Sequence, residues 1–166
     1  MSASTDIQTT LEGIKTQLTA RIPTQITAIF ADNGTVLSAL SKIQIVKRID
    51  DPIPYERPHV AIMVDGIVEK EDMLSAKYNL RMPLLVAVTL DATADDEEGV
   101  SQANYWGRVI DNALAATQQG GALNSIGVYW IDVEGAELEE ANEDARNFLR
   151  VNSTALVHVR TTRAVA

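Results

Sequence analysis

The sequence predicts an α+β fold in which an antiparallel or mixed β-sheet carries helices packed on one face. Apolar residues recur at helical spacing in residues 7–18 and 103–114, whereas they alternate with polar residues in residues 78–90 and 148–160. In chain order this gives a helix, a hairpin with a long strand, a second helix and two further strands. Strands in that order can share one sheet, with the helices on the same side of it.

Composition favours one globular domain that spans residues 1–166. The chain is 46% hydrophobic and 22% charged, which is typical of folded proteins. The absence of cysteine excludes disulfides, thiolate zinc sites and thiol nucleophiles, and it favours a reducing, cytoplasmic origin. Apolar runs are too short to span a bilayer, and the first residues have neither the basic nor the apolar region of an export signal. We therefore expect a soluble protein without a membrane partner.

The first residues predict an amphipathic helix. Thr5 and Gln8 have the spacing of a capping box. Pro23 is expected to end or kink the helix because proline lacks an N–H donor, and residues 24–30 would then form a second short helix. Asn33-Gly34 is a turn signal. The apolar positions that repeat at helical spacing are Ile7, Leu11, Ile14 and Leu18.

Residues 35–90 predict most of the sheet. Residues 35–50 fit a short helix or a strand, and the three prolines in DPIPYERP indicate a stiff connector. His59–Val64 is a strand candidate, and Asp65-Gly66 suits a tight turn, so residues from Ile67 onward are expected to pair back on it. The alternation from Tyr78 to Leu90 predicts a long strand with one buried face. Pro83, on the opposite face, favours an edge position or a bulge.

The second helix is expected to begin near a capping box formed by Thr93 and Asp96 and to end at Gly120-Gly121. Asn104, Arg108 and Asp111 should point away from its apolar stripe. The stripe consists of Ala103, Trp106, Ile110, Ala113 and Leu114.

The last part of the chain predicts a strand over residues 126–133, an acidic loop or short exposed helix up to residue 144, and a final half-buried strand over 148–160. Tyr129 and Trp130 are adjacent, so in a regular strand one ring faces the core and the other faces solvent or a partner. An exposed ring there would be a natural interface anchor. The alternative is a sheet that is covered on both faces.

Acidic residues are concentrated in two windows of this chain, whose net charge is −9. The two windows contain no Lys or Arg and together carry −12, so the rest of the chain, with 14 basic and 11 acidic residues, sums to +3. Such surfaces repel phosphate, which argues against tight nucleic-acid binding by them. The windows contain Asp91, Asp95, Asp96, Glu97 and Glu98, and then Asp132, Glu134, Glu137, Glu139, Glu140, Glu143 and Asp144.

No pattern in the sequence predicts a catalytic residue, a metal ligand or a cofactor site. The two histidines, His59 and His158, lie in predicted strands without a nucleophile elbow, so we interpret them as strand positions. Phosphate-binding glycine loops are absent. The basic residues Lys42, Lys47 and Arg48 are interpreted as an ordinary solvated face.

The carboxylates from Asp91 to Glu98 offer oxygen ligands to a hard cation, but they lack EF-hand spacing, and helix capping explains Thr93, Asp95 and Asp96. A small divalent-metal-dependent enzyme that acts on phosphodiesters through this cluster is the less favoured alternative. A host adaptor module that recruits a protein partner is another.

Five segments follow the leading amphipathic helix in order: PHVAIMVDG, a long strand ending PLLVAVTLDA, a helix beginning DDEEGVSQANYWGRVIDNAL, the strand VYWIDVEG and the final strand FLRVNSTALVHVR. With this layout, nearly the whole chain resembles the tail-terminator proteins of tailed phages. The resemblance implies a structural protein without catalytic residues or cofactors. It further implies a homo-oligomer, as a hexameric ring that ends tail-tube assembly.

The resemblance also implies partners and a location. The ring would contact the tail tube or sheath protein and the head connector, with DNA passing through its lumen without sequence-specific binding. It would reside in the tail-neck region of the virion after assembly in the host cytoplasm. A head-to-tail adaptor, neck or minor tail protein is the alternative. The acidic candidates for the lumen are Asp95, Asp96, Glu97, Glu98, Glu137, Glu139 and Glu140, and the interface candidates are Tyr129, Trp130 and Tyr55.

Overall fold

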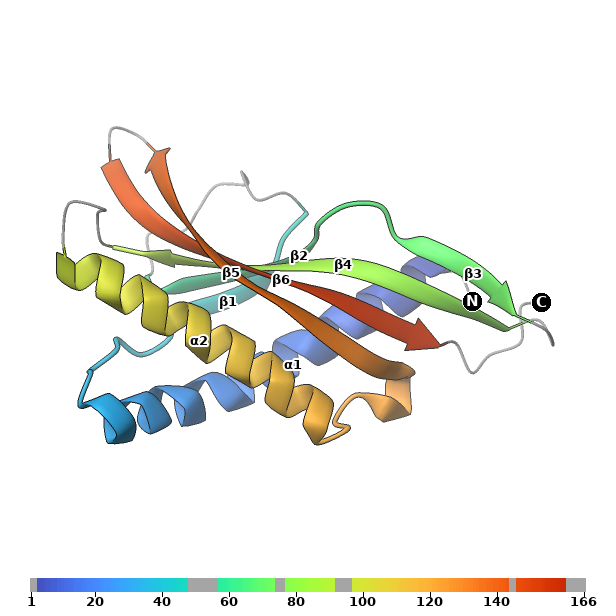
Figure 1. Cartoon of the computed structure of the whole chain (residues 1–166). Coiled ribbons are helices and arrows are strands. Elements are labelled where there is room, and N and C mark those ends of the chain that lie inside the picture. The colour runs from blue at the N-terminus through green and yellow to red at the C-terminus, as the bar shows by residue number, and fades with distance from the viewer. Residues whose placement is uncertain (1–2, 48–56, 74–76, 92–96, 144–145, 161–166) are drawn as a thin grey trace.

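A computed structural model describes residues 3–47, 57–73, 77–91, 97–143 and 146–160 of the chain. Within these ranges the chain forms two α-helices, a short 3-10 helix and six β-strands (Figure 1). In chain order they are α1 (Ala3–Asn33), β1 (Lys42–Ile45), β2 (His59–Val64), β3 (Glu69–Met73), β4 (Lys77–Leu90), α2 (Glu97–Gln119), η1 (Asn124–Ile126), β5 (Val128–Glu143) and β6 (Arg146–Arg160).

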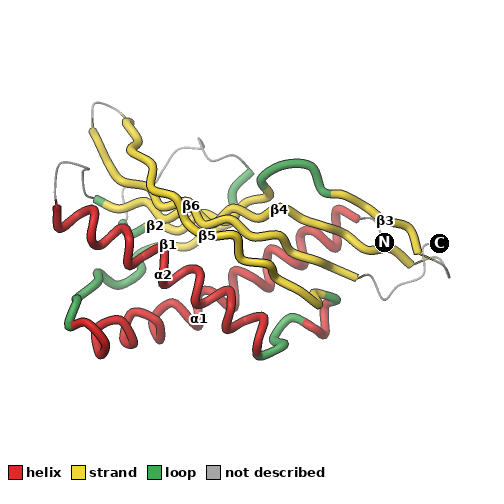
Figure 2. Tube along the Cα trace, in the orientation of Figure 1, coloured by secondary structure: helices red, strands yellow, loops and turns green. Residues whose placement is uncertain are grey.

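The strands form one mixed sheet with the order β1-β2-β4-β6-β5, and β3 also pairs with β4. β1 runs parallel to β2, and every other neighbouring pair is antiparallel. Both helices lie on the same side of the sheet (Figures 1 and 2). The α+β fold with a mixed sheet and helices on one face is therefore confirmed.

The hydrophobic core lies between the two helices and the sheet. Trp106, the largest fully buried side chain, projects from α2 into it. β4 contributes every second residue from Leu80 to Leu90, as the alternation predicts. The predicted helical stripes are confirmed, because the α1 residues Leu11, Ile14 and Leu18 and the α2 residues Ala103, Ile110, Ala113 and Leu114 are all buried.

Of the two effects expected of Pro23, an end or a kink, the end is wrong, because α1 continues through this residue and includes residues 24–30. Pro23 lies on the exposed side of α1, where water can replace the N–H that proline cannot donate. Ile22 and Ile29 are buried on either side of it, and this packing holds the helix together across the break. The axis of α1 changes direction part-way along (Figures 1 and 2). The expected capping box is also wrong, since α1 begins at Ala3 and includes Thr5.

The expected hairpin between residues 59–64 and the chain after Ile67 is also wrong. β2 and β3 instead pair one after the other with the same side of β4. Between them, residues 65–68 leave the ladder, and the Asp65 N–H donates to the Pro83 carbonyl at 2.9 Å. The nitrogen and carbonyl of a strand residue point to the same side, so the missing N–H of Pro83 faces this interruption. Pro83 thus sits in a central strand, not at an edge, without breaking a ladder bond.

β5 corrects a further expectation, because the acidic residues after Val133 form a strand rather than a loop or short helix. β5 pairs with β6 from Val128↔Val159 to Glu143↔Arg146, with register shifts between Val128 and Trp130 and between Val133 and Gly135. The cross-strand hydrogen bonds of β6 hold this segment extended despite its charge. β1 resolves the open choice for residues 35–50 in favour of a strand. Of the connector DPIPYERP, only Arg57 and Pro58 lie within the described residues.

α2 ends at Gln119, directly before Gly120-Gly121 as predicted, and Gly121 adopts a positive φ of 60°. Its first described residue is Glu97, so the predicted caps Thr93 and Asp96 lie outside the described residues.

Gly127, between η1 and β5, has no room for a side chain. Its φ is 97°, and a Cβ atom there would lie 2.3 Å from the Arg160 carbonyl oxygen. Gly34 also has a positive φ, 68°, but nothing lies within 4 Å of its Cβ position. We expect Gly127→Ala to lower the free energy of unfolding by more than ~3 kcal/mol and Gly34→Ala by only about 1–2 kcal/mol. Chemical denaturation measures both, and equal losses would contradict the predicted clash.

The two tryptophans make a matched pair for testing the core. Trp106 is 0% exposed and Trp130 is 50% exposed. Trp106→Ala removes a buried ring and leaves a cavity, so we expect a loss of about 3–5 kcal/mol in the free energy of unfolding. Trp130→Ala should change it by less than about 1 kcal/mol. Urea unfolding followed by circular dichroism compares the two, and a larger loss for Trp130→Ala would refute the placement of the core.

Candidate assembly interface

β5 is the strand at one end of the sheet, and its outer edge is only partly covered. The Gln118 side chain from α2 accepts a hydrogen bond from the Ile131 N–H at 2.8 Å and donates one to the Tyr129 carbonyl at 3.5 Å. Beyond this point no other strand in the described ranges pairs with that edge. The sequence gives no signal for the role of Gln118, because a polar residue in a helix is ordinarily solvated.

Tyr129 and Trp130 are both exposed, at 40% and 50%, so the expectation that one ring faces the core is wrong. The register shift between Val128 and Trp130 inserts Tyr129 as an extra residue and interrupts the alternation of faces. The ring centroids of Tyr129 and His158 are 5.8 Å apart. The guanidinium carbon of Arg160 lies 4.8 Å from the Tyr129 ring centroid. The structure therefore places both predicted anchors on the surface.

The acidic candidates on β5 are exposed. Glu137 and Glu139 stand opposite Asn152 and Arg150 of β6, and Glu140 stands opposite Leu149. Asn152 donates a hydrogen bond to the Glu139 carboxylate at 2.6 Å. Leu138, between them, is 43% exposed. These carboxylates therefore belong to a long ordered strand and not to a loop.

Of the other acidic candidates, the described ones lie at the start of α2. Glu97 and Glu98 lie in its first turn, where the positive end of the helix dipole favours negative charge. The start of α2 and the far end of the β5–β6 hairpin lie at the same end of the molecule (Figure 1). The structure thus brings the start of α2, with Glu97 and Glu98, and the far end of β5 to one end of the molecule. Asp95, Asp96 and Tyr55 lie outside the described residues.

A groove of ≈ 240 Å³ separates α2 from β5 where β5 diverges from the helix. The two elements approach closely at Gly107, because a Cβ atom at this residue would lie 3.0 Å from the Ala136 Cβ. Burial raises the pKa of Asp111 above its ordinary value of 3.8, and the neighbouring Ser153 hydroxyl partly offsets this rise. The lining residues include Asn104, Arg108 and Asp111, which the sequence places off the apolar stripe, together with Glu137 and Leu138.

β1 forms the opposite end of the sheet. The Lys42 and Val46 N–H groups donate to the Pro58 and Ile62 carbonyls of the β2 side, at 3.4 and 2.9 Å. Backbone groups alternate along a strand, so those of Ile43 and Ile45 point away from β2, to the side where no other strand of the described ranges pairs. Lys42 and Lys47 are exposed beside them, as the interpretation of a solvated basic face expects, and Arg48 lies outside the described residues.

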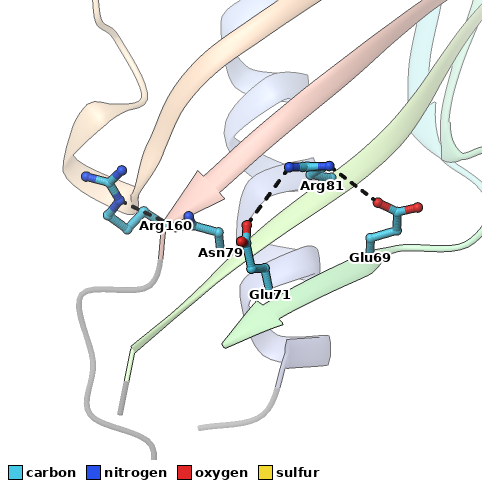
Figure 3. Close-up of polar contacts among 5 residues, drawn as sticks. All are labelled: Glu69, Glu71, Asn79, Arg81 and Arg160. Carbon is cyan, nitrogen blue, oxygen red and sulfur yellow. Dashed lines mark hydrogen bonds and ion pairs between the residues drawn. The ribbon is translucent and has the colours of Figure 1, made fainter. Parts of the chain in front are cut away.

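A third charged surface covers the β3–β4 hairpin, on the sheet near the end of β6. The guanidinium nitrogens of Arg81 lie 3.8 Å from a Glu69 carboxylate oxygen and 3.9 Å from a Glu71 carboxylate oxygen (Figure 3). The Arg160 Nε–H donates a hydrogen bond to the Asn79 side-chain oxygen at 3.4 Å. The ion-paired side chains Arg81, Glu69 and Glu71 are well exposed, so these pairs contribute little to stability. Their charges are balanced locally, unlike those of β5.

The described residues contain no group of three or more side chains placed to hold a metal ion. His59 is buried in β2 and His158 lies in β6, so both occupy strand positions as interpreted. Asp91, Glu97 and Glu98, from the cluster of the metal-enzyme alternative, are exposed, and residues 92–96 lie outside the described part. Neither described helix is long and apolar enough to cross a membrane.

No model of a known protein family matches the sequence, and no curated protein matches it. Among solved structures, the chain is similar to one described as "Virion of native gene transfer agent (GTA) particle". The TM-score is 0.30 and the sequence identity 14%, with 86% of this chain and 93% of that chain covered. A likeness at this level carries no inference about function.

Asp111 gives the groove a measurable dependence on pH. Its pKa is higher in the folded chain, so wild-type protein loses stability as the pH rises through that folded value. Asp111→Asn removes the ionisation, and we expect the variant to gain stability relative to wild type at about pH 8, with the gain shrinking towards about pH 3.5.

Urea unfolding across this pH range measures the difference. Asp132→Asn, at an exposed position of β5, serves as the control and should change the free energy of unfolding by less than about 0.5 kcal/mol at either pH. A gain for Asp111→Asn that is independent of pH would contradict the role of ionisation.

Proposed function

We propose that this chain is a structural virion protein that forms a ring at the head-proximal end of a phage tail, ends tail-tube assembly and joins the tube to the head connector. Its work is done by surfaces and not by reactive groups. The proposal starts from the resemblance of the sequence to tail-terminator proteins, and the order of elements in the fold agrees with that resemblance.

The observation that carries the proposal is the edge of β5. This strand is 16 residues long, and beyond Gln118 its outer hydrogen-bonding groups meet no other described strand. Long open edges are sites of strand addition by another chain. Exposed Tyr129, Trp130 and Leu138 lie along the same strand, and aromatic side chains are frequent anchors of interfaces. An isolated chain leaves these backbone groups and apolar side chains exposed to water, whereas an assembly would pair and bury them.

The acidic end of the molecule supports the part of the proposal that concerns DNA. In a ring, carboxylates that face the lumen repel the phosphate backbone and keep the passing DNA from adhering. Glu97, Glu98, Glu137, Glu139 and Glu140 are the described candidates for that surface, and Asp95 and Asp96 are proposed on sequence grounds alone. A head-to-tail adaptor or minor tail protein would use the same surfaces against a different ring.

Light scattering after size-exclusion chromatography tests the assembly. We expect a particle of six 18.1 kDa chains, about 109 kDa, whose population rises with protein concentration. Electron microscopy of purified tail tubes mixed with the protein should show density capping one tube end. Binding to the head connector but not to tubes would favour the adaptor role. A strictly monomeric protein that binds neither would refute the proposal.

A further inference from the structure

The two ends of the sheet carry charges of opposite sign. β5 contains no Lys or Arg, and its exposed side chains include Asp132, Glu134, Glu137, Glu139 and Glu140. Residues 41–47, at and beside β1, contain Lys42 and Lys47 and no acidic residue, and both lysines are exposed. In the sheet order, β1 and β5 are the two terminal strands. Charge is therefore polarised across the sheet.

Both terminal strands also offer backbone groups. The N–H and C=O groups of Ile43 and Ile45 point away from β2, and the part of β5 beyond Gln118 meets no further strand among the described residues. Strand addition between two such edges satisfies the groups on each. The geometry and the charge thus favour the same partner.

We propose that the acidic β5 edge of one copy binds the basic β1 edge of the next copy, so that the sheets join edge to edge around the assembly. This interface rests on the proposed ring function and specifies which surfaces meet. The contact is heterologous, because one patch meets a different patch, and contacts of this kind generate rings when the rotation between copies closes.

The same charges select against the alternative contacts. Pairing β5 with β5 would bring the carboxylates of two copies within a Debye length, about 8–10 Å at ordinary salt, and they would repel. Pairing β1 with β1 would do the same to Lys42 and Lys47. Charged edge residues commonly prevent indiscriminate strand pairing, and here they leave the head-to-tail contact as the attractive one. Glu137, Glu139 and Glu140 then serve the junction, and Glu97 and Glu98 are the described candidates left for the lumen.

Charge reversal tests the interface in three variants. The first is E137K/E139K/E140K on β5, and the second is K42E/K47E beside β1. The matched control, E12K/D32K/D72K, makes the same charge change as the first at exposed positions away from both edges. Circular dichroism confirms that each variant is folded, and the neutral variant E137Q/E139Q/E140Q provides a milder change at the same positions.

Sedimentation velocity at about 0.1 M salt measures self-association. We expect each edge variant to weaken association by about tenfold or more, the glutamine variant to weaken it less, and the control to stay within about twofold of wild type. An equimolar mixture of the two edge variants should assemble again, because each reversed edge then meets a complementary one.

The outcomes separate the interface from the function. If wild-type protein forms rings and the edge variants assemble equally well, the interface is overturned and the proposed function stands. If only the β5 variant is impaired, β1 is not the partner edge and the interface is likewise overturned. If wild-type protein stays monomeric at every concentration and binds no tail tubes, the proposed function falls, and the interface falls with it.

Discussion

The pairing of β4 with β6 is the interaction on which the rest of the structure depends. It runs unbroken from Asn79↔Arg160 to Leu90↔Leu149, through the centre of the sheet. A slip of one residue would turn Leu84, Val157 and their neighbours from the core to the opposite face, so burial fixes this register strongly. β2 and β3 attach to the free side of β4, and β5 attaches to the free side of β6. Every surface proposed for assembly is therefore positioned by this one ladder.

The two sides of the ladder serve different purposes. On the β4 side, α1 packs beneath the sheet, and the Tyr78 hydroxyl donates a hydrogen bond to the Asp6 carboxylate, which ties the first turns of α1 to the start of β4. On the β6 side, β5 lies along α2 from Gln118, at Ile131, to Gly107, at Ala136, and the groove beside Asp111 lies between the two elements there. The acidic surface proposed for assembly therefore lies on the β6 side of the ladder.

Periodic segments could be predicted from the sequence because burial imposes their period. The alternation from Leu80 to Leu90 and the stripe around Trp106 record the face that packs against the helices, but Leu85 and Ala87, on the opposite face of β4, are buried as well, which the alternation does not predict. The errors occur where tertiary contacts override a local signal. Burial of Ile22 and Ile29 stabilises α1 on both sides of Pro23. The chain after Gly66 pairs with β4 as β3, instead of pairing with β2 in a hairpin. The acidic half of β5 has no apolar alternation to reveal it, since it is held mainly by pairing with β6 and by the contact of Ala136 with Gly107. Of the candidate site, the charge of the edge was visible in the sequence, but its strand structure and the bulge at Tyr129 were not.

The interruption at residues 65–68 has a consequence for how the protein can be modified. Pro83 of β4 has no N–H group, so residues 65–68 need not supply a hydrogen-bond acceptor to β4 at this position. The side chain of Ile67 is 85% exposed. The length and composition of this short excursion are thus uncoupled from the strand register on both sides of it. A fluorophore or an affinity peptide inserted at Ile67 would be attached next to the central strand β4 and would report the orientation of each copy within an assembled particle.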